Sequence, residues 1–384
     1  MNNYHISEFE SIRPYEDCEI QSVVNQLKSE ESFLVLLKFL YPGVAPDVIL
    51  DRVSKLTSIR QFQQEVISSY VRGVISSTSQ GVTIEGLDGL IPDKSYLFIS
   101  NHRDIILDPA ILNVLLIENG FNTTEIAIGD NLLIYKWITD LVKLNRTFIV
   151  KRNLPVKQML ESSSILSNYI RYTLTGKGNS IWIAQREGRS KDGNDRTQVS
   201  LLKMMNMSGK NSLVQNFGEL NIVPVSISYE YDPCDYLKSE EFLMKKKDSE
   251  HHKTKDDDLK HMGTGLRGRK GRIHFSFGQP ITDELSTIEH LTVKNDQFTA
   301  LAELIDKHVH LNYHLWPSNY ISWDLLNNSD EYQSFYNKEQ KESFLEYINE
   351  HESRCKLTDE DDKKFMRTCM LEMYANPVEN KRLY

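Results

Sequence analysis

Residues 96–109 read YLFISNHRDIILDP, an apolar run that passes into polar residues and then into a second apolar stretch. Residues 96–100 have the length and composition of a buried strand. From about residue 106 to residue 118 the apolar side chains recur at helical spacing. A strand, a polar turn and a helix form the repeating unit of α/β sheets, whose ligands bind at the carboxyl ends of the strands. The polar residues 100–104 are therefore candidates for a functional site.

The same unit recurs along the chain. Short apolar segments predict further strands at residues 82–86, 125–128, 147–150, 180–184, 222–228 and 272–278. Helical periods separate them at residues 134–144, 156–174 and 198–207. This alternation predicts an α/β layer built from crossover units.

Both flanks of the layer have apolar residues at helical spacing. We therefore expect a helical region at residues 1–80, an α/β domain at residues 81–290 and a second helical region at residues 291–384. The last of these should contain helices at residues 300–311, 330–348 and 358–374.

A charge-dense segment at about residues 238–272 interrupts the α/β domain. Between residues 245 and 272, ten lysines or arginines face five acids, a net charge of +5 in a protein of net charge −9. Two interpretations stay open. The segment is a contact surface for anionic lipid headgroups or a nucleotide phosphate, or it is a solvated charged linker.

Composition excludes several classes of protein. The acidic balance argues against nucleic acid as a partner. The four cysteines form no Cys-x-x-Cys pair, so neither a metal site nor a disulfide framework is indicated. No apolar run approaches the ~20 residues of a membrane-spanning helix. We expect a cytoplasmic protein that is peripherally associated with the inner face of an anionic membrane.

The candidate catalytic group is a histidine at a strand end. His102 follows the strand predicted at residues 96–100, and Asp104 and Asp108 are close to it in sequence. A histidine titrates near pH ~6.5 and can act as a base. A neighbouring carboxylate fixes the tautomer and stabilises the protonated ring. Such a pair is suited to taking a proton from a hydroxyl group.

Residues 101–109 resemble the first signature of the glycerolipid acyltransferase family, whose PlsC-like members make phosphatidic acid. The family pattern is His-x4-Asp, often written Asn-His-x-Ser-x-Leu-Asp-Pro. Both ends match here, but His102 and Asp108 are spaced as His-x5-Asp, and Leu107 holds the strict position. The Leu-Asp-Pro setting favours Asp108 as the partner of His102, through a bulged turn. Asp104 is the alternative.

The second motif of the family, Phe-Ile-x-Arg on a strand, resembles residues 148–152, FIVKR. Lys151 holds the basic place of the motif and Arg152 follows it. The resemblance implies that these cations bind the phosphate of the acyl acceptor. A guanidinium can do so through two hydrogen bonds.

Two later segments complete the resemblance. Residues 187–190, EGRS, resemble the third motif, Glu-Gly-Thr-Arg-Ser, with the threonine missing. This implies that Glu187, Gly188 and Arg189 belong to the phosphate site, where Gly188 lets backbone amides approach closely and Arg189 adds charge. Residues 222–226, IVPVS, resemble the fourth motif, which implies that Pro224 borders the pocket of the acyl donor.

Together these motifs imply an α/β fold with a mixed central sheet and flanking helices. They also imply transfer of a fatty acyl group from acyl-CoA or acyl carrier protein to a hydroxyl of an acceptor. That acceptor would be 1-acylglycerol 3-phosphate (lysophosphatidic acid) or glycerol 3-phosphate, with no metal and no bound cofactor. Two alternatives remain: a non-catalytic peripheral membrane or lipid-binding relative, and an acyl-thioesterase that uses water as acceptor.

Overall fold

The computed structural model describes residues 6–41, 43–152 and 154–384, which form a seven-stranded sheet of order β1-β7-β6-β2-β5-β3-β4. The strands are β1 (Ser79–Glu85), β2 (Leu97–Ser100), β3 (Glu125–Gly129), β4 (Thr147–Val150), β5 (Ile181–Ala184), β6 (Ile222–Tyr229) and β7 (Gly271–Phe277). Five of them, from β6 to β4 in that order, are parallel, whereas β7 is antiparallel to β6 and carries β1 alongside it. The predicted α/β fold with a mixed central sheet is confirmed.

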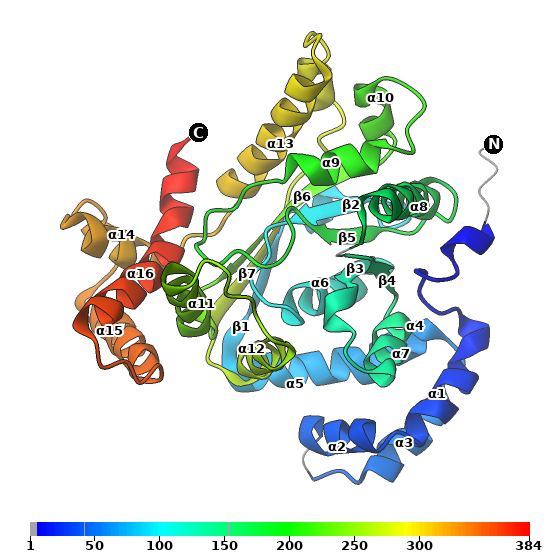
Figure 1. The fold of residues 1–384 in the computed structure, drawn as a ribbon, viewed down its shortest axis with the longest axis horizontal. Coiled ribbons are helices and arrows are strands. Elements are labelled where there is room, and N and C mark those ends of the chain that lie inside the picture. The colour runs from blue at the N-terminus through cyan, green and yellow to red at the C-terminus, as the bar shows by residue number, and fades with distance from the viewer. Residues whose placement is uncertain (1–5, 42, 153) are drawn as a thin grey trace.

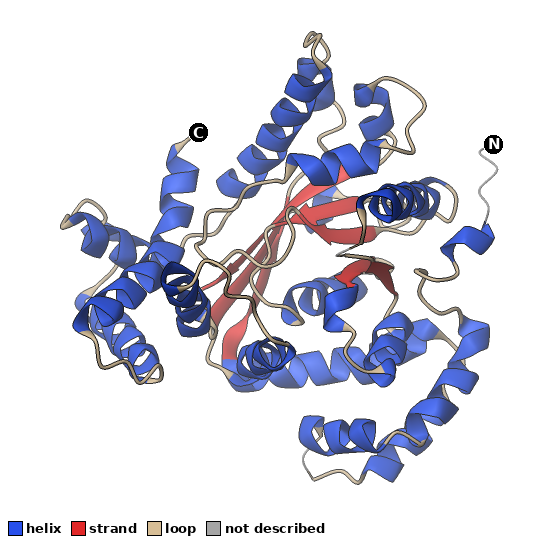
Figure 2. Ribbon diagram, in the orientation of Figure 1, coloured by secondary structure: helices blue, strands red, loops and turns tan. Residues whose placement is uncertain are grey.

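Helices cover both faces of the sheet (Figures 1 and 2). Those connecting or covering the strands are α6 (Leu107–Glu118), α7 (Lys136–Leu144), α8 (Val156–Thr175), α9 (Val199–Asn206), α10 (Leu213–Gly218) and α13 (Lys294–Leu311). Leu97 and Ile99 of β2 pack in the core with α8, α9 and α13. Phe98, between them, belongs to the core on the opposite face, with α6. Because alternate side chains of β2 enter two different cores, the strand is apolar from Leu97 to Ile99.

Helical extensions lie on opposite sides of this sheet (Figure 1). The amino-terminal extension contains α1 (Ile20–Lys28), α2 (Glu31–Leu40), α3 (Pro46–Ser54), α4 (Ile59–Phe62) and α5 (Ser68–Thr78). The carboxyl-terminal one contains α14 (Pro317–Asn327), α15 (Lys338–Ser353) and α16 (Glu360–Arg382). The helix predicted over residues 330–348 begins later, at Lys338. Asn337 caps α15 there in a capping box with Gln340.

The charge-dense segment is folded, so its interpretation as a solvated linker is wrong. It forms most of α11 (Asp235–Lys247), all of α12 (Lys255–Arg267) and the start of β7. Lys238 of α11 is fully buried, and His261 of α12 is 4% exposed. Low hydrophobicity concealed these buried faces, because their polar groups are satisfied by distant partners rather than by water.

Across residues 6–41, 43–152 and 154–384, we find no helix with the length and apolarity needed to traverse a bilayer.

Candidate active site

The chain remains fixed to its neighbours beyond the end of β2. The side chain of Asn101 bridges to β6, since its Oδ1 accepts from the backbone N–H of Ile227 (2.8 Å) and its Nδ2 donates to the Ile227 carbonyl (2.9 Å). On the other side, the indole of Trp182 donates to Ser100 Oγ at 3.0 Å. The two neighbouring strands therefore hold the two residues before His102, with β6 fixing Asn101 and β5 fixing Ser100.

His102 contacts Asp108, with its Nδ1 2.7 Å from Oδ2 of the carboxylate. Asp108 lies in the first turn of α6 and is completely buried. The same Oδ2 accepts from the backbone N–H groups of Arg103 (2.5 Å) and Asp104 (3.0 Å). The chain between His102 and α6 thus wraps around the carboxylate, and this turn accommodates the extra residue of the His-x5-Asp spacing.

The surroundings of this pair determine which ring nitrogen can react. The Asp108 carboxylate accepts from two backbone N–H groups and offers only acceptor oxygens, so His102 Nδ1 is the donor in the bond between them. Tyr229 holds the other oxygen, because its hydroxyl donates to Asp108 Oδ1 at 3.0 Å. The imidazole meets the ring of Trp182 edge to face, with centroids 5.4 Å apart. Nε2 is therefore the basic nitrogen of an imidazole of fixed orientation.

Asp104, the alternative partner, has a different set of contacts. Its Oδ1 accepts from the backbone N–H groups of Ile106 (2.9 Å) and Leu107 (2.8 Å), so it caps the start of α6. Burial raises the pKa of Asp104, and the charge of Asp108 raises it further. Of the two acids, Asp108 is the one placed against His102.

The residues of the second and third motifs meet at the same edge of the sheet. Arg152 Nη1 lies 3.0 Å from Glu187 Oε1, and the Arg152 backbone N–H donates to Asp130 at 3.2 Å. Gly188 is exposed at a φ of 71°, a conformation that glycine adopts readily. Lys151 is exposed next to Arg152. The structure thus brings Arg152 and Glu187 together at the end of β4.

Arg189 points inward rather than to solvent. Its Nη2 lies 2.9 Å from Nδ1 of His261 on α12, and its Nη1 finds no hydrogen-bond partner among the residues that the structure describes. Burial lowers the pKa of His261 to about 2, with the Arg189 charge contributing, so the imidazole is neutral and accepts from the guanidinium. The next residue of the motif, Ser190, donates its backbone N–H to the His102 carbonyl at 2.9 Å. The third motif is thereby joined to the catalytic turn.

Pro224 is buried within β6, opposite Ile99 of β2. Its carbonyl accepts from the Gly278 N–H at 2.9 Å, immediately after β7 ends at Phe277. The N–H of a residue points to the same neighbouring strand as its carbonyl, so the N–H that proline lacks would face Gly278, beyond the end of β7. Its absence costs no hydrogen bond between β6 and β7, and a proline therefore fits in this central strand.

Sequence reasoning missed Arg103, for which we made no prediction. Its guanidinium forms two hydrogen bonds with Asp195, at 2.8 and 2.6 Å, and both side chains are buried. Its carbonyl accepts from Nζ of the buried Lys238 at 3.0 Å, and Lys238 also pairs with Asp232 at 2.5 Å. No local signal marks these partners, because they are more than 90 residues away in the chain.

The loop that carries Asp195 gives a prediction about pH. Thr197 donates to Asp306 through its backbone N–H (2.7 Å) and its hydroxyl (2.6 Å), and burial raises the pKa of Asp306 to about 6. The folded protein thus binds this proton more tightly than the unfolded chain, whose aspartates titrate near pH ~4. The tighter binding of this proton stabilises the folded protein below pH ~4. This stabilisation is lost as the pH rises through the folded-state pKa of about 6.

We expect Asp306→Asn to remove this loss. Wild type should lose this contribution to its free energy of unfolding between pH 4 and pH 7, and the variant should not. The difference in free energy of unfolding, variant minus wild type, should therefore rise by on the order of 2–3 kcal/mol over that range. Urea denaturation at both pH values measures the difference. Asp296→Asn, an exposed change on the same helix, is the control. If the free energy of unfolding changed equally with pH in wild type and in Asp306→Asn, the prediction would be contradicted.

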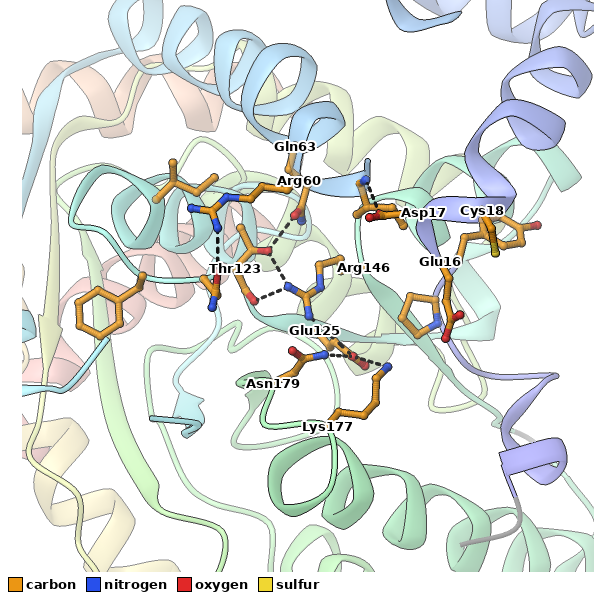
Figure 3. A pocket seen from close by; sticks show the side chains of 16 residues that line it. Glu16, Asp17, Cys18, Arg60, Gln63, Thr123, Glu125, Arg146, Lys177 and Asn179 are labelled. Atoms are coloured by element: carbon orange, nitrogen blue, oxygen red, sulfur yellow. Dashed lines mark hydrogen bonds and ion pairs between the residues drawn. The ribbon is translucent and has the colours of Figure 1, made fainter. Parts of the chain in front are cut away.

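A cavity of about 580 Å³ lies at the opposite end of the parallel strands (Figure 3). Its floor is Glu125, which is 1% exposed and accepts from Lys177 and Asn179, both at 3.1 Å. Arg146 donates to the carbonyl and the hydroxyl of Thr123 at 3.1 and 3.2 Å. The lining of the cavity contains three cations (Arg60, Arg146 and Lys177) and three acids (Glu16, Asp17 and Glu125). We interpret this balanced network as a structural link between the amino-terminal extension and the sheet.

Comparison with known proteins places the site within a recognised domain. Residues 81–228 match the model of the family described as Acyltransferase. No curated protein matches the chain. Among solved structures, the 1-acyl-sn-glycerophosphate (LPA) acyltransferase PlsC from Thermotoga maritima is similar, at 10% identity and a TM-score of 0.36. That match covers 76% of this chain and 94% of the other. The matched segment 81–228 runs from β1 to β6 and contains all four motifs.

Proposed function

We propose that the chain is a glycerolipid acyltransferase, because residues 81–228 match the Acyltransferase family model and contain the four motifs that resemble that family. It transfers a fatty acyl group from acyl-CoA or acyl carrier protein to the free hydroxyl of 1-acylglycerol 3-phosphate. The observation that carries this proposal is the oriented pair of His102, which is partly exposed, and the buried Asp108.

In this reaction His102 is the general base. Nε2 accepts the proton of the acceptor hydroxyl while the oxygen attacks the carbonyl carbon of the thioester. The tetrahedral intermediate then collapses, the C–S bond breaks, and the thiolate takes the proton back from the imidazolium. Asp108 keeps the imidazole in the reactive tautomer and stabilises its protonated form.

The cations at the carboxyl edge bind the acceptor phosphate. Arg152 presents a partly exposed guanidinium beside the exposed Lys151, whereas the buried Arg189 faces His261 and supports the third motif from within. Charge-assisted hydrogen bonds from such groups suit a phosphate. Glycerol 3-phosphate carries the same phosphate and is the second acceptor to test. The enzyme would act at the inner face of an anionic membrane, as a peripheral protein without a bound cofactor.

Thiol release by the purified protein tests this function. We expect release from palmitoyl-CoA or palmitoyl-acyl carrier protein to rise at least about tenfold when 1-acylglycerol 3-phosphate or glycerol 3-phosphate is added. Release that does not depend on either acceptor would indicate a thioesterase instead. If no pair of donor and acceptor gave release above the background, the non-catalytic lipid-binding interpretation would replace the enzyme.

A further inference from the structure

The beginning of α8 projects from the protein body. Every residue from 155 to 161 is exposed, and the first buried side chain of the helix is Leu166. Val156, Met159 and Leu160 have 76%, 48% and 61% of their surface exposed. Positions i, i+3 and i+4 share one side of a helix, so these three side chains form one apolar face. Among the large apolar residues whose side-chain exposure the structure describes, which leaves out residues 36, 39 and 40, no other three exposed ones fall within one helical turn.

Basic residues flank this apolar face. Lys151 and Lys157 are exposed, Arg152 is partly exposed, and Glu161 is the one acid between residues 151 and 161. An apolar helical face edged with lysines suits the boundary of an anionic bilayer. There the apolar side chains enter the acyl region and the cations meet lipid phosphates.

The face lies at the same edge of the sheet as the catalytic histidine. The loop before α8 carries Arg152, which pairs with Glu187 of the third motif. Three residues further on, Ser190 donates its backbone N–H to the His102 carbonyl. A lipid acceptor that leaves a bilayer at this face would thus reach the catalytic edge without crossing the protein.

The basic segment around α11, the other candidate for lipid contact, is already engaged within the protein. Lys245 pairs with Glu241 at 3.4 Å, and Lys247 pairs with Asp362 of α16. Lys246 lies 4.1 Å from the ring centroid of Phe365. These intramolecular contacts compete with lipid phosphates, whereas the start of α8 offers apolar surface as well as charge.

We propose that the first two turns of α8 insert Val156, Met159 and Leu160 into the headgroup boundary of an anionic bilayer and hold the catalytic edge against it. The choice of a bilayer as the partner rests on the proposed function, because that reaction has a lipid acceptor. Membrane binding itself does not require catalysis, so the two can be tested separately.

The test is sedimentation of the full-length protein with phosphatidylcholine vesicles, with and without phosphatidylglycerol. Wild type should bind the anionic vesicles, more weakly at high salt. The double variant Met159→Glu/Leu160→Glu should weaken this binding by about tenfold or more. Val48→Glu, at a 61% exposed position of α3, is the matched control and should bind like wild type. Equal thermal midpoints establish that the variants are folded.

Three results would overturn the proposal. Wild type could fail to bind anionic vesicles, the double variant could bind as wild type does, or the double variant could lose only self-association in analytical ultracentrifugation. The last result would assign the face to a second copy of the chain. Thiol release from a short-chain acyl-CoA with glycerol 3-phosphate, measured without vesicles, should be equal in wild type and the double variant. If no pair of donor and acceptor gives release while vesicle binding depends on α8, the proposed function fails and the membrane face stands.

Discussion

Replacement of His102 by alanine is expected to lower kcat for acceptor-dependent thiol release by about 10³-fold or more. General base catalysis contributes about 10²–10⁴-fold, and the variant has no second base at this position. Asp108 contacts the imidazole directly, but it is completely buried and holds two backbone N–H groups, so it cannot replace the histidine as base. KM for the acceptor should change little, because the residues proposed to bind the phosphate, Lys151 and Arg152, are unchanged in this variant.

The control for this prediction is His290→Ala, which removes an exposed histidine outside the site. It should retain the kcat of wild type. The thermal midpoint of His102→Ala shows whether the variant is folded. If folded His102→Ala retained kcat within a few-fold of wild type, another group would have to be the base, and the mechanism proposed above would be wrong.

Asp108→Asn is expected to lower kcat by about 10²–10⁴-fold. The amide can keep its oxygen toward the N–H groups of Arg103 and Asp104, with its NH₂ toward the Tyr229 hydroxyl. The turn can therefore persist while the negative charge is lost. A neutral amide stabilises an imidazolium poorly, so the barrier to proton transfer rises. The pH dependence of kcat should also shift, which loss of structure alone would not produce.

Asp104→Asn separates the two candidate partners of His102. Asparagine can keep the bonds that Asp104 accepts from Ile106 and Leu107, so we expect less than about a tenfold fall in kcat. Burial already favours the neutral acid by raising the pKa of Asp104, and an amide imitates that form. If Asp104→Asn were the more damaging of the two changes, Asp104 and not Asp108 would be the partner during catalysis.

The positions of the strands were readable from sequence because hydrophobic periodicity is a local property. A strand buried on both faces is predominantly apolar, and β2, β5 and β6 all lie where short apolar runs predicted strands. The order of the strands was not readable. It depends on which distant segments pair, and β7 returns antiparallel beside β6 after two helices that low hydrophobicity concealed.

The sequence by itself determined the α/β alternation and the strand end that carries His102, because both depend on neighbouring residues. Only the tertiary structure decided between Asp104 and Asp108, since spacing cannot show how a turn closes around a carboxylate. It alone also identified the long-range partners of Arg103, which are Asp195 and Lys238. Buried polar groups require hydrogen-bond partners wherever the fold supplies them, and sequence distance carries no information about where those partners are.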